Sequence, residues 1–199
     1  MPDEVLHDLC KAVDAVASTF DGRGSAIKER ELEMALETAL WALGREPRRQ
    51  LRILLKDAWN GQVGGVDLAL DADSAPILIE LKWDPGTLAA CAWDSMKLAA
   101  ALQSAEGKRA FLIAGSPASE RLQGDELLED ADVGPVDLRR RYAEKFDFWR
   151  GDVKNHPHSA PAGWRTRLHH SVDLSFKDAP WRIRLAELEL TNAELIPCK

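Results

Sequence analysis

Three charged residues, Asp67, Glu80 and Lys82, stand inside the most strand-like stretch of the chain, VDLALDADSAPILIELKW at 66–83. Two apolar runs in this stretch flank a polar turn, which predicts a β-hairpin. Because side chains alternate between the two faces of a strand, Glu80 and Lys82 share one face, while the apolar residues beside them point into a core. If that face is open to solvent, Glu80 and Lys82 form a surface ion pair. If both faces of the sheet are covered, as the apolar run at 77–81 suggests, the charged residues indicate chemistry.

The spacing of the two acids sets the kind of chemistry. If Asp71 pairs with Pro76 around a four-residue loop, Asp67 lies directly opposite Glu80, with Cβ atoms about 5 Å apart. Two carboxylates at that distance repel unless a cation lies between them. Lys82, one step along the strand, can supply the positive charge, and so can a bound divalent ion. Hard carboxylate ligands suit Mg²⁺ or Mn²⁺.

The helices that must position this hairpin are predicted from apolar spacing. Helical stripes run over about 3–19 and 26–43. A third helix, over about 87–105, is too apolar all round to lie on a surface. These helices are expected to flank a sheet that contains the hairpin.

Two further strands complete the sheet. RAFLIAG, at 109–115, is a short continuous apolar run, typical of a strand buried on both faces. The run LRILLKDAW, at 51–59, fits a short helix or a strand, and periodicity does not decide between them. The resulting order of elements predicts a compact α/β unit.

The same residues carry a resemblance to a known family. Asp67 followed by the tripeptide ELK at 80–82 resembles the D…(D/E)-x-K signature of the PD-(D/E)xK nuclease superfamily, also called restriction-endonuclease-like. The order of elements over about 22–115 is similar to that family's αβββαβ core, with a central mixed sheet between helices. The resemblance implies that 51–59 is the first core strand. The residue before Asp67 is Val66, not the proline of the signature.

The resemblance also implies a role for each residue of the signature. Asp67, Glu80 and the carbonyl of Leu81 would hold Mg²⁺ or Mn²⁺, which polarises a scissile phosphate and lowers the pKa of a water molecule. Lys82 would orient that water and stabilise the developing negative charge. The family often has a further acid on the first helix, and Glu33 is the best match because it shares a face with apolar residues of that helix.

Other charged residues near the signature are weaker candidates. Glu29 and Glu37 are alternatives to Glu33 on the same helix. Asp94 and Lys97 interrupt the long apolar middle of the next helix and, at i and i+3, can meet on one face. Lys97 would contact phosphate or the attacking water, with Asp94 orienting it, or the two form a local ion pair at the rim of the helix.

A basic stretch leads into the first expected strand. It fits contacts to a phosphate backbone, although most charge runs are solvated surface. A net charge of −7 argues against a protein that wraps nucleic acid through general electrostatics, but a local basic groove is compatible with it. The candidates in this stretch are Arg45, Arg48, Arg49 and Arg52.

Residues 117–199 are expected to form a C-terminal α+β elaboration of the same domain, with 22–116 as the core and 1–21 as an N-terminal helix packed on it. Helices are predicted over 118–130 and 135–149, and a loop over 151–164. Alternating apolar residues then predict a second hairpin, with a bulge near Ala186 because the apolar parity of the return strand changes there. This hairpin either extends the main sheet or stands apart from it.

These observations lead to two hypotheses. The first is a Mg²⁺- or Mn²⁺-dependent nuclease with a nucleic-acid partner, DNA favoured over RNA. The second is an inactive module of the same fold that binds a protein or a nucleic acid, in which one of Asp67, Glu80 or Lys82 points away or is occluded. Three scattered cysteines and the acidic N-terminus predict a cytoplasmic protein, and no apolar run is long enough to span a membrane. A homodimer is left open.

Overall fold

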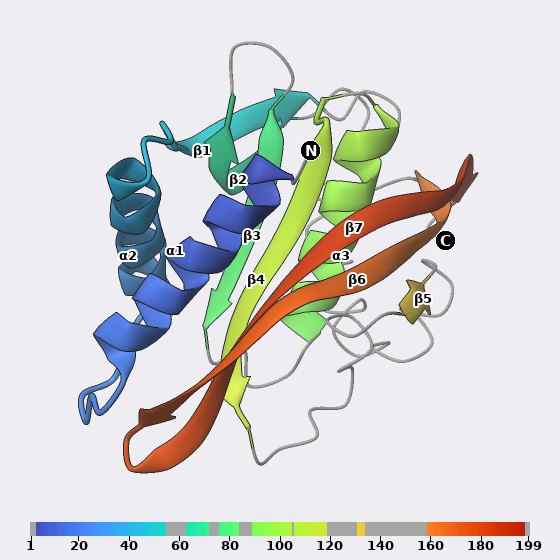
Figure 1. Ribbon diagram of the computed structural model, residues 1–199. Helices are drawn as coiled ribbons and strands as arrows, with labels where there is room; N and C mark the ends of the chain where they lie inside the picture. Colours follow the sequence, from blue (N-terminus) through green and yellow to red (C-terminus); the bar gives the residue numbers. More distant parts are fainter. Residues whose placement is uncertain are drawn as a thin grey trace.

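The computed structural model describes residues 3–54, 63–71, 76–83, 89–104, 106–118, 131–133 and 159–197. Within these ranges, three helices flank one mixed sheet of seven strands, in the order β1-β2-β3-β4-β7-β6-β5 (Figure 1). The expected α/β class is confirmed. The helices are α1 (Glu4–Phe20), α2 (Glu29–Ala42) and α3 (Ala89–Gln103). The strands are β1 (Arg48–Leu54), β2 (Val63–Leu70), β3 (Ile77–Trp83), β4 (Arg109–Pro117), β5 (Ala131–Val133), β6 (Ser159–Phe176) and β7 (Ala179–Pro197).

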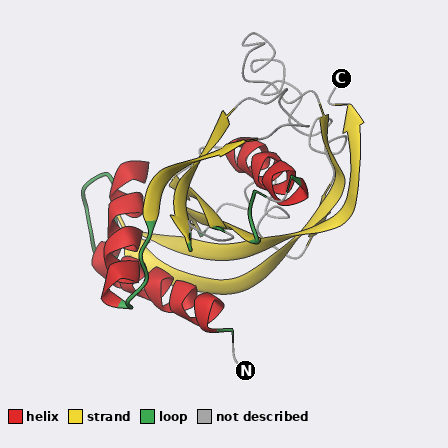
Figure 2. Ribbon diagram, turned by 90° about the horizontal axis from the view of Figure 1, so that it is seen from above, coloured by secondary structure: helices red, strands yellow, loops and turns green. Residues whose placement is uncertain are grey.

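Both faces of the sheet are covered by helices. α1 and α2 pack on one face, and α3 packs on the other, where the sheet curves around it (Figure 2). Leu98, Ala99 and Ala100 follow one another around α3 in steps of about 100°, and all three are fully buried. This enclosure explains why the sequence of α3 is apolar all round, as predicted. No helix in the described ranges is long and apolar enough to cross a membrane.

α2 begins three residues later than the apolar pattern predicts. The carboxylate of Glu31 accepts a hydrogen bond of 2.9 Å from the backbone N–H of Lys28, which satisfies one of the free donors at the start of the helix. Leu32, Leu36 and Leu40 then form the fully buried stripe that packs on the sheet. The acids on the intervening turns of α2 are thereby held close to the sheet.

The strands of the first half follow the predicted pattern. The ambiguous run at 51–59 is a strand in its described part, because β1 ends at Leu54 and 55–59 lie outside the described residues. β2 and β3 pair antiparallel with Leu68 opposite Ile79, which is the predicted register. β3 and β4 pair in parallel, with α3 in the connection between them.

The C-terminal hairpin extends the main sheet, because β7 pairs antiparallel with β4. The loop predicted over 151–164 is wrong for its last six positions, since β6 already begins at Ser159. The helices predicted over 118–130 and 135–149 lie outside the described residues, apart from Ala118.

A bulge lies at the place predicted, near Ala186, but on the partner strand. β7 pairs with β4 without a shift in register, whereas the register between β6 and β7 shifts between Leu168 and His170, opposite Ala186. Ile183 and Leu185 face the α1 side, whereas Ala186 and Leu188 face the α3 side. Apolar residues of both parities are needed because both faces of the strand are covered.

An aromatic cluster holds the carboxyl end of β3. The Trp83 ring stacks on Trp181 with centroids 5.0 Å apart and meets Phe20 and Phe176 edge-on at 5.4 Å each. Across the parallel pair, Trp83 lies opposite Gly115, which leaves room for the indole. Because Trp83 follows Lys82 directly in the chain, this cluster also fixes the candidate site.

The contact between Gly115 and Trp83 makes the first testable prediction. A Cβ at Gly115 would lie 2.3 Å from the indole, which three aromatic neighbours hold in place, so Gly115→Ala must displace the ring. We expect a loss of about 1–3 kcal/mol in the free energy of unfolding, measured by chemical denaturation. Gly24→Ala is the matched control, because a Cβ there meets nothing within 4 Å. Equal stability of the two variants would contradict the packing described here.

Candidate functional site

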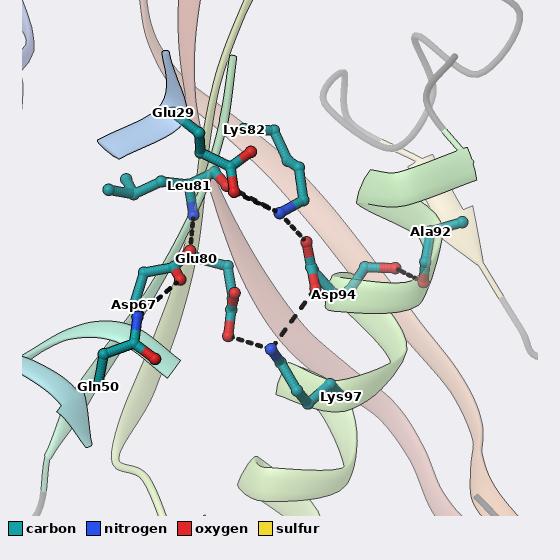
Figure 3. A network of polar contacts seen from close by, with 10 residues as sticks. Glu29, Gln50, Asp67, Glu80, Leu81, Lys82, Ala92, Asp94 and Lys97 are labelled. Atoms are coloured by element: carbon teal, nitrogen blue, oxygen red, sulfur yellow. Dashed lines mark hydrogen bonds and ion pairs between the residues drawn. The ribbon is translucent and has the colours of Figure 1, made fainter. Parts of the chain in front are cut away.

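β2 and β3 separate next to the predicted site. Their ladder of paired residues ends at Leu68 and Ile79, although the same register continued by one step would place Asp67 opposite Glu80. Beyond that point, Oδ2 of Asp67 accepts a hydrogen bond of 2.8 Å from the backbone N–H of Leu81 (Figure 3). The carboxylate thus takes the place of a ladder carbonyl, and the two strands diverge around it.

Gln50 contacts Asp67 from the other side. The register between β1 and β2 brings Gln50 across from Asp67, and its Nε2 lies 3.5 Å from Oδ1 of that carboxylate. Gln50 has a φ of 50°, which is uncommon for a residue other than glycine. The sequence offers no signal for this contact, because nothing in the residue types of β1 predicts a left-handed position within a strand.

Glu80 is almost completely buried, with 1% of its surface exposed. The Nζ of Lys97, on α3, lies 2.6 Å from its Oε1. Burial, followed by the charge of Asp94, raises the pKa of the Glu80 carboxyl well above its usual range, and Asp67 adds to the rise. Lys97 opposes this shift but does not cancel it, because one cation faces several acids.

Lys82 is held by acids from both faces of the sheet. Its Nζ lies 3.0 Å from Oδ2 of Asp94 on α3 and 3.3 Å from Oε1 of Glu29 on α2. It also donates a hydrogen bond of 3.1 Å to the carbonyl of Leu81, the predicted metal ligand. Burial disfavours its charged form, but Asp94 and Glu29 outweigh burial and raise the pKa of Lys82. Lys82 is therefore a permanent cation at neutral pH.

Asp94 connects the two lysines. It is 4% exposed, and its two oxygens face Lys82 at 3.0 Å and Lys97 at 3.5 Å. Asp94 and Lys97 do meet on one face of α3, as their spacing predicts, but they belong to a larger network and not to an isolated pair at the helix rim. Figure 3 shows the chain of contacts from Glu29 through Lys82, Asp94 and Lys97 to Glu80.

The acids of α2 divide between two partners. Glu29, the weaker candidate from sequence, reaches Lys82, whereas Glu33 pairs with Arg49 of β1 at 3.6 Å. Burial raises the pKa of Glu33; Arg49 opposes the rise, and the nearby charge of Asp67 adds to it. Glu33 therefore points toward the sheet near Asp67, as its place on the apolar face predicts.

The basic stretch has mixed roles. Arg45 pairs with Asp8 of α1 at 2.7 Å, which ties the end of α2 to α1. Arg49 forms ion pairs with both Glu33 and Glu37. Arg48 and Arg52 lie on β1 with exposed side chains and stay candidates for phosphate contact.

Negative charge exceeds positive charge in this cluster. Within the part of the chain that the structure describes, four basic side chains, those of Lys82, Lys97, Arg49 and the exposed Arg30, lie near six carboxyl groups. Among the described residues, Oε1 of Glu80 and Oδ2 of Asp94 are buried without a hydrogen-bond partner, although a lysine Nζ lies within ion-pair distance of each. The six carboxyl groups are those of Glu29, Glu33, Glu37, Asp67, Glu80 and Asp94.

The donor chemistry of the cluster fits a divalent cation. Hard carboxylate oxygens, two of them buried and without hydrogen bonds, are the ligand type that Mg²⁺ and Mn²⁺ prefer. In the arrangement observed, however, no group of three or more His, Cys, Asp or Glu side chains in the described ranges is set to hold a metal ion. Lysine ammonium groups lie against the acids instead.

Comparisons of the chain with protein-family models, with curated proteins and with solved structures return no match. No relative therefore supplies a role for any residue of the cluster. What the cluster can do has to be inferred from its own distances, burial and charges.

The raised pKa of Glu80 makes a prediction about stability. An unfolded glutamate releases its proton near pH 4.3, so above that pH the folded state binds more protons and loses stability as pH rises. We expect Glu80→Gln, in chelator, to lose less stability than wild type between pH 5 and pH 8, because the amide has no proton to release. Chemical denaturation at each pH measures the free energy of unfolding of both proteins. An equal loss of stability in the two proteins over this range would refute this view of Glu80.

Proposed function

We propose that the protein is a metal-dependent nuclease with a restriction-endonuclease-like core. One observation carries the proposal: Asp67, Glu80 and Lys82, from two neighbouring strands, lie in one polar network at the place where those strands diverge. A packing role does not call for such a network, because buried ion pairs are commonly less stabilising than apolar residues of the same volume.

The order of elements supports the same proposal. α2, three strands, α3 and β4 follow one another in the order expected for the core, and the sheet is mixed. Asp67 stands on the second of these strands and Glu80 and Lys82 on the third, which matches the positions that the resemblance assigns to the signature.

The proposed ligands of the divalent ion are the carboxylates of Asp67 and Glu80 and the carbonyl of Leu81. When bound, Mg²⁺ or Mn²⁺ supplies a Lewis acid for a phosphoryl oxygen and makes water a better nucleophile at neutral pH. The three ligand groups face Lys97, Lys82 and a backbone N–H at present, so loading requires a local rearrangement of side chains.

The lysines act as cations in this proposal, not as bases. The pKa of Lys82 is raised by Asp94 and Glu29, which keeps its ammonium group protonated. A protonated lysine can orient water by hydrogen bonding and stabilise negative charge that develops on a phosphate. Asp94 fixes the direction of Lys82, because its Oδ2 lies 3.0 Å from the ammonium nitrogen.

A second function is favoured by one specific observation. Glu80 is 1% exposed and is covered by Lys97, so the site is closed in the arrangement described. Closure of this kind suits a module of the same fold that binds nucleic acid or protein without cleaving it. Binding of DNA or RNA in a gel-shift assay, without cleavage in the experiment below, would favour this second function.

Cleavage assays test the nuclease directly. Single- and double-stranded DNA and RNA are incubated with Mg²⁺ or Mn²⁺, and products are resolved by electrophoresis. We expect cleavage that chelator abolishes and that Asp67→Asn or Lys82→Met lowers on the order of a hundredfold or more, since each removes a group placed at the reacting phosphate. Asp173→Asn and Lys11→Met, both exposed and outside the network, are the matched controls and should cleave like wild type.

The outcome that would refute the nuclease is equally definite. Activity that persists in excess chelator, or in the Asp67→Asn and Lys82→Met variants, cannot arise from the proposed site. Absence of cleavage on all four substrates, with a folded protein, would also count against it.

A further inference from the structure

Lys97 occupies an unusual position for a lysine. It projects from the middle of α3, the helix enclosed by the sheet, and 15% of its side chain is exposed. Its Nζ lies 2.6 Å from Oε1 of Glu80, but this oxygen has no hydrogen bond that meets ordinary geometry among the described residues. The contact is therefore a close pairing of charges rather than a well-directed hydrogen bond.

The ammonium group of Lys97 lies where it can balance the charge of the buried Glu80 carboxylate. Glu80 is buried beside Asp94 and Asp67, and a buried carboxylate needs a positive charge nearby to stay ionised. Lys97 is the cation that lies against it in this structure. A divalent ion on the same carboxylate would face the lysine charge at close range inside a poorly screened site, where such repulsion is strong.

We propose that Lys97 is the resident cation of Glu80 and that a divalent ion binds by displacing its ammonium group from that carboxylate. The ligand class is a divalent cation that prefers oxygen. The inference rests on the proposed function, since it takes Glu80 as a ligand of the ion, and it adds that the site carries its own competitor for the ion.

The displaced ammonium group has a second partner within reach. Oδ1 of Asp94, one helical turn earlier on α3, lies 3.5 Å from Nζ of Lys97. A small change of side-chain torsions shortens this contact while it lengthens the one to Glu80, so Lys97 keeps a counter-charge after displacement. Lys82 does not pair with a carboxylate ligand, because its acidic partners, Asp94 and Glu29, are not proposed ligands. Of the proposed ligand groups, Lys82 contacts the carbonyl of Leu81, through a hydrogen bond of 3.1 Å.

The experiment compares the thermal stability and the Mn²⁺ affinity of Lys97→Met with those of wild type at one pH. In chelator, the variant leaves Glu80 without its cation, and its melting temperature should fall. Added Mn²⁺ should restore the melting temperature, because the ion replaces the missing charge, and the gain should exceed that of wild type. In calorimetric titration, Mn²⁺ should bind the variant on the order of tenfold more tightly, since no ammonium group has to be displaced.

Two further variants keep the result decisive. Lys97→Gln, which retains a polar side chain, replaces Lys97→Met if the latter fails to fold, and the same tighter binding is expected. Lys11→Met removes one positive charge from the exposed face of α1 and should bind Mn²⁺ like wild type. If Lys11→Met increased the Mn²⁺ affinity as much as the Lys97 variant, the effect would come from the net charge of the protein and not from the place of Lys97. That result would overturn the proposal.

The possible failures separate the two proposals. Mn²⁺ binding that is unchanged or weaker in both Lys97 variants overturns the role of Lys97 and leaves the nuclease proposal standing. Failure of wild type and both Lys97 variants to bind Mn²⁺ overturns the metal site itself, and the role of Lys97 with it.

Discussion

The hydrogen bond from the Leu81 N–H to the Asp67 carboxylate determines how the rest of the site is arranged. By taking a donor that would otherwise belong to the β2–β3 ladder, Asp67 ends the pairing of these strands at Leu68 and Ile79. Groups from both faces of the sheet can meet at the gap that results. Glu29 approaches from α2 and Asp94 from α3, and both reach the same ammonium group of Lys82. A fully paired sheet would separate these two acids.

The arrangement of the site also depends on the burial that the helices on both faces of the sheet provide. α3 lies inside the curve of the sheet and brings Asp94 and Lys97 into a region with little exposure to water (Figure 2). Low exposure strengthens every charge interaction there and makes unpaired charges costly. It explains why the pKa of Glu80 is raised and why each lysine lies within ion-pair distance of an acid. The fold therefore concentrates charge where water cannot screen it.

Much of this arrangement could be predicted from the sequence, because it depends on local patterns. Period-2 alternation and the turn length gave the register of the hairpin, and the uniform apolarity of α3 indicated that this helix is enclosed. Features that depend on tertiary contacts were missed. The parity change at Ala186 reflects a strand covered on both faces, and the contact of Gln50 with Asp67 depends on a left-handed backbone position that residue type does not signal. Which of the three α2 acids, Glu29, Glu33 or Glu37, reaches Lys82 likewise depends on how the helix is rotated against the sheet.

The pairing of lysines with acids bears on whether the site is built for binding an ion or only for stability. If stability were the only requirement, apolar side chains at Glu80, Asp94 and Lys97 would fill the same space without the cost of removing charges from water. Two buried carboxylate oxygens without hydrogen bonds add to that cost. A site that exchanges an internal ammonium group for an external ion, as proposed above, requires charged side chains at these positions. The buried charges around Glu80 are thus the feature that a purely structural network leaves unexplained.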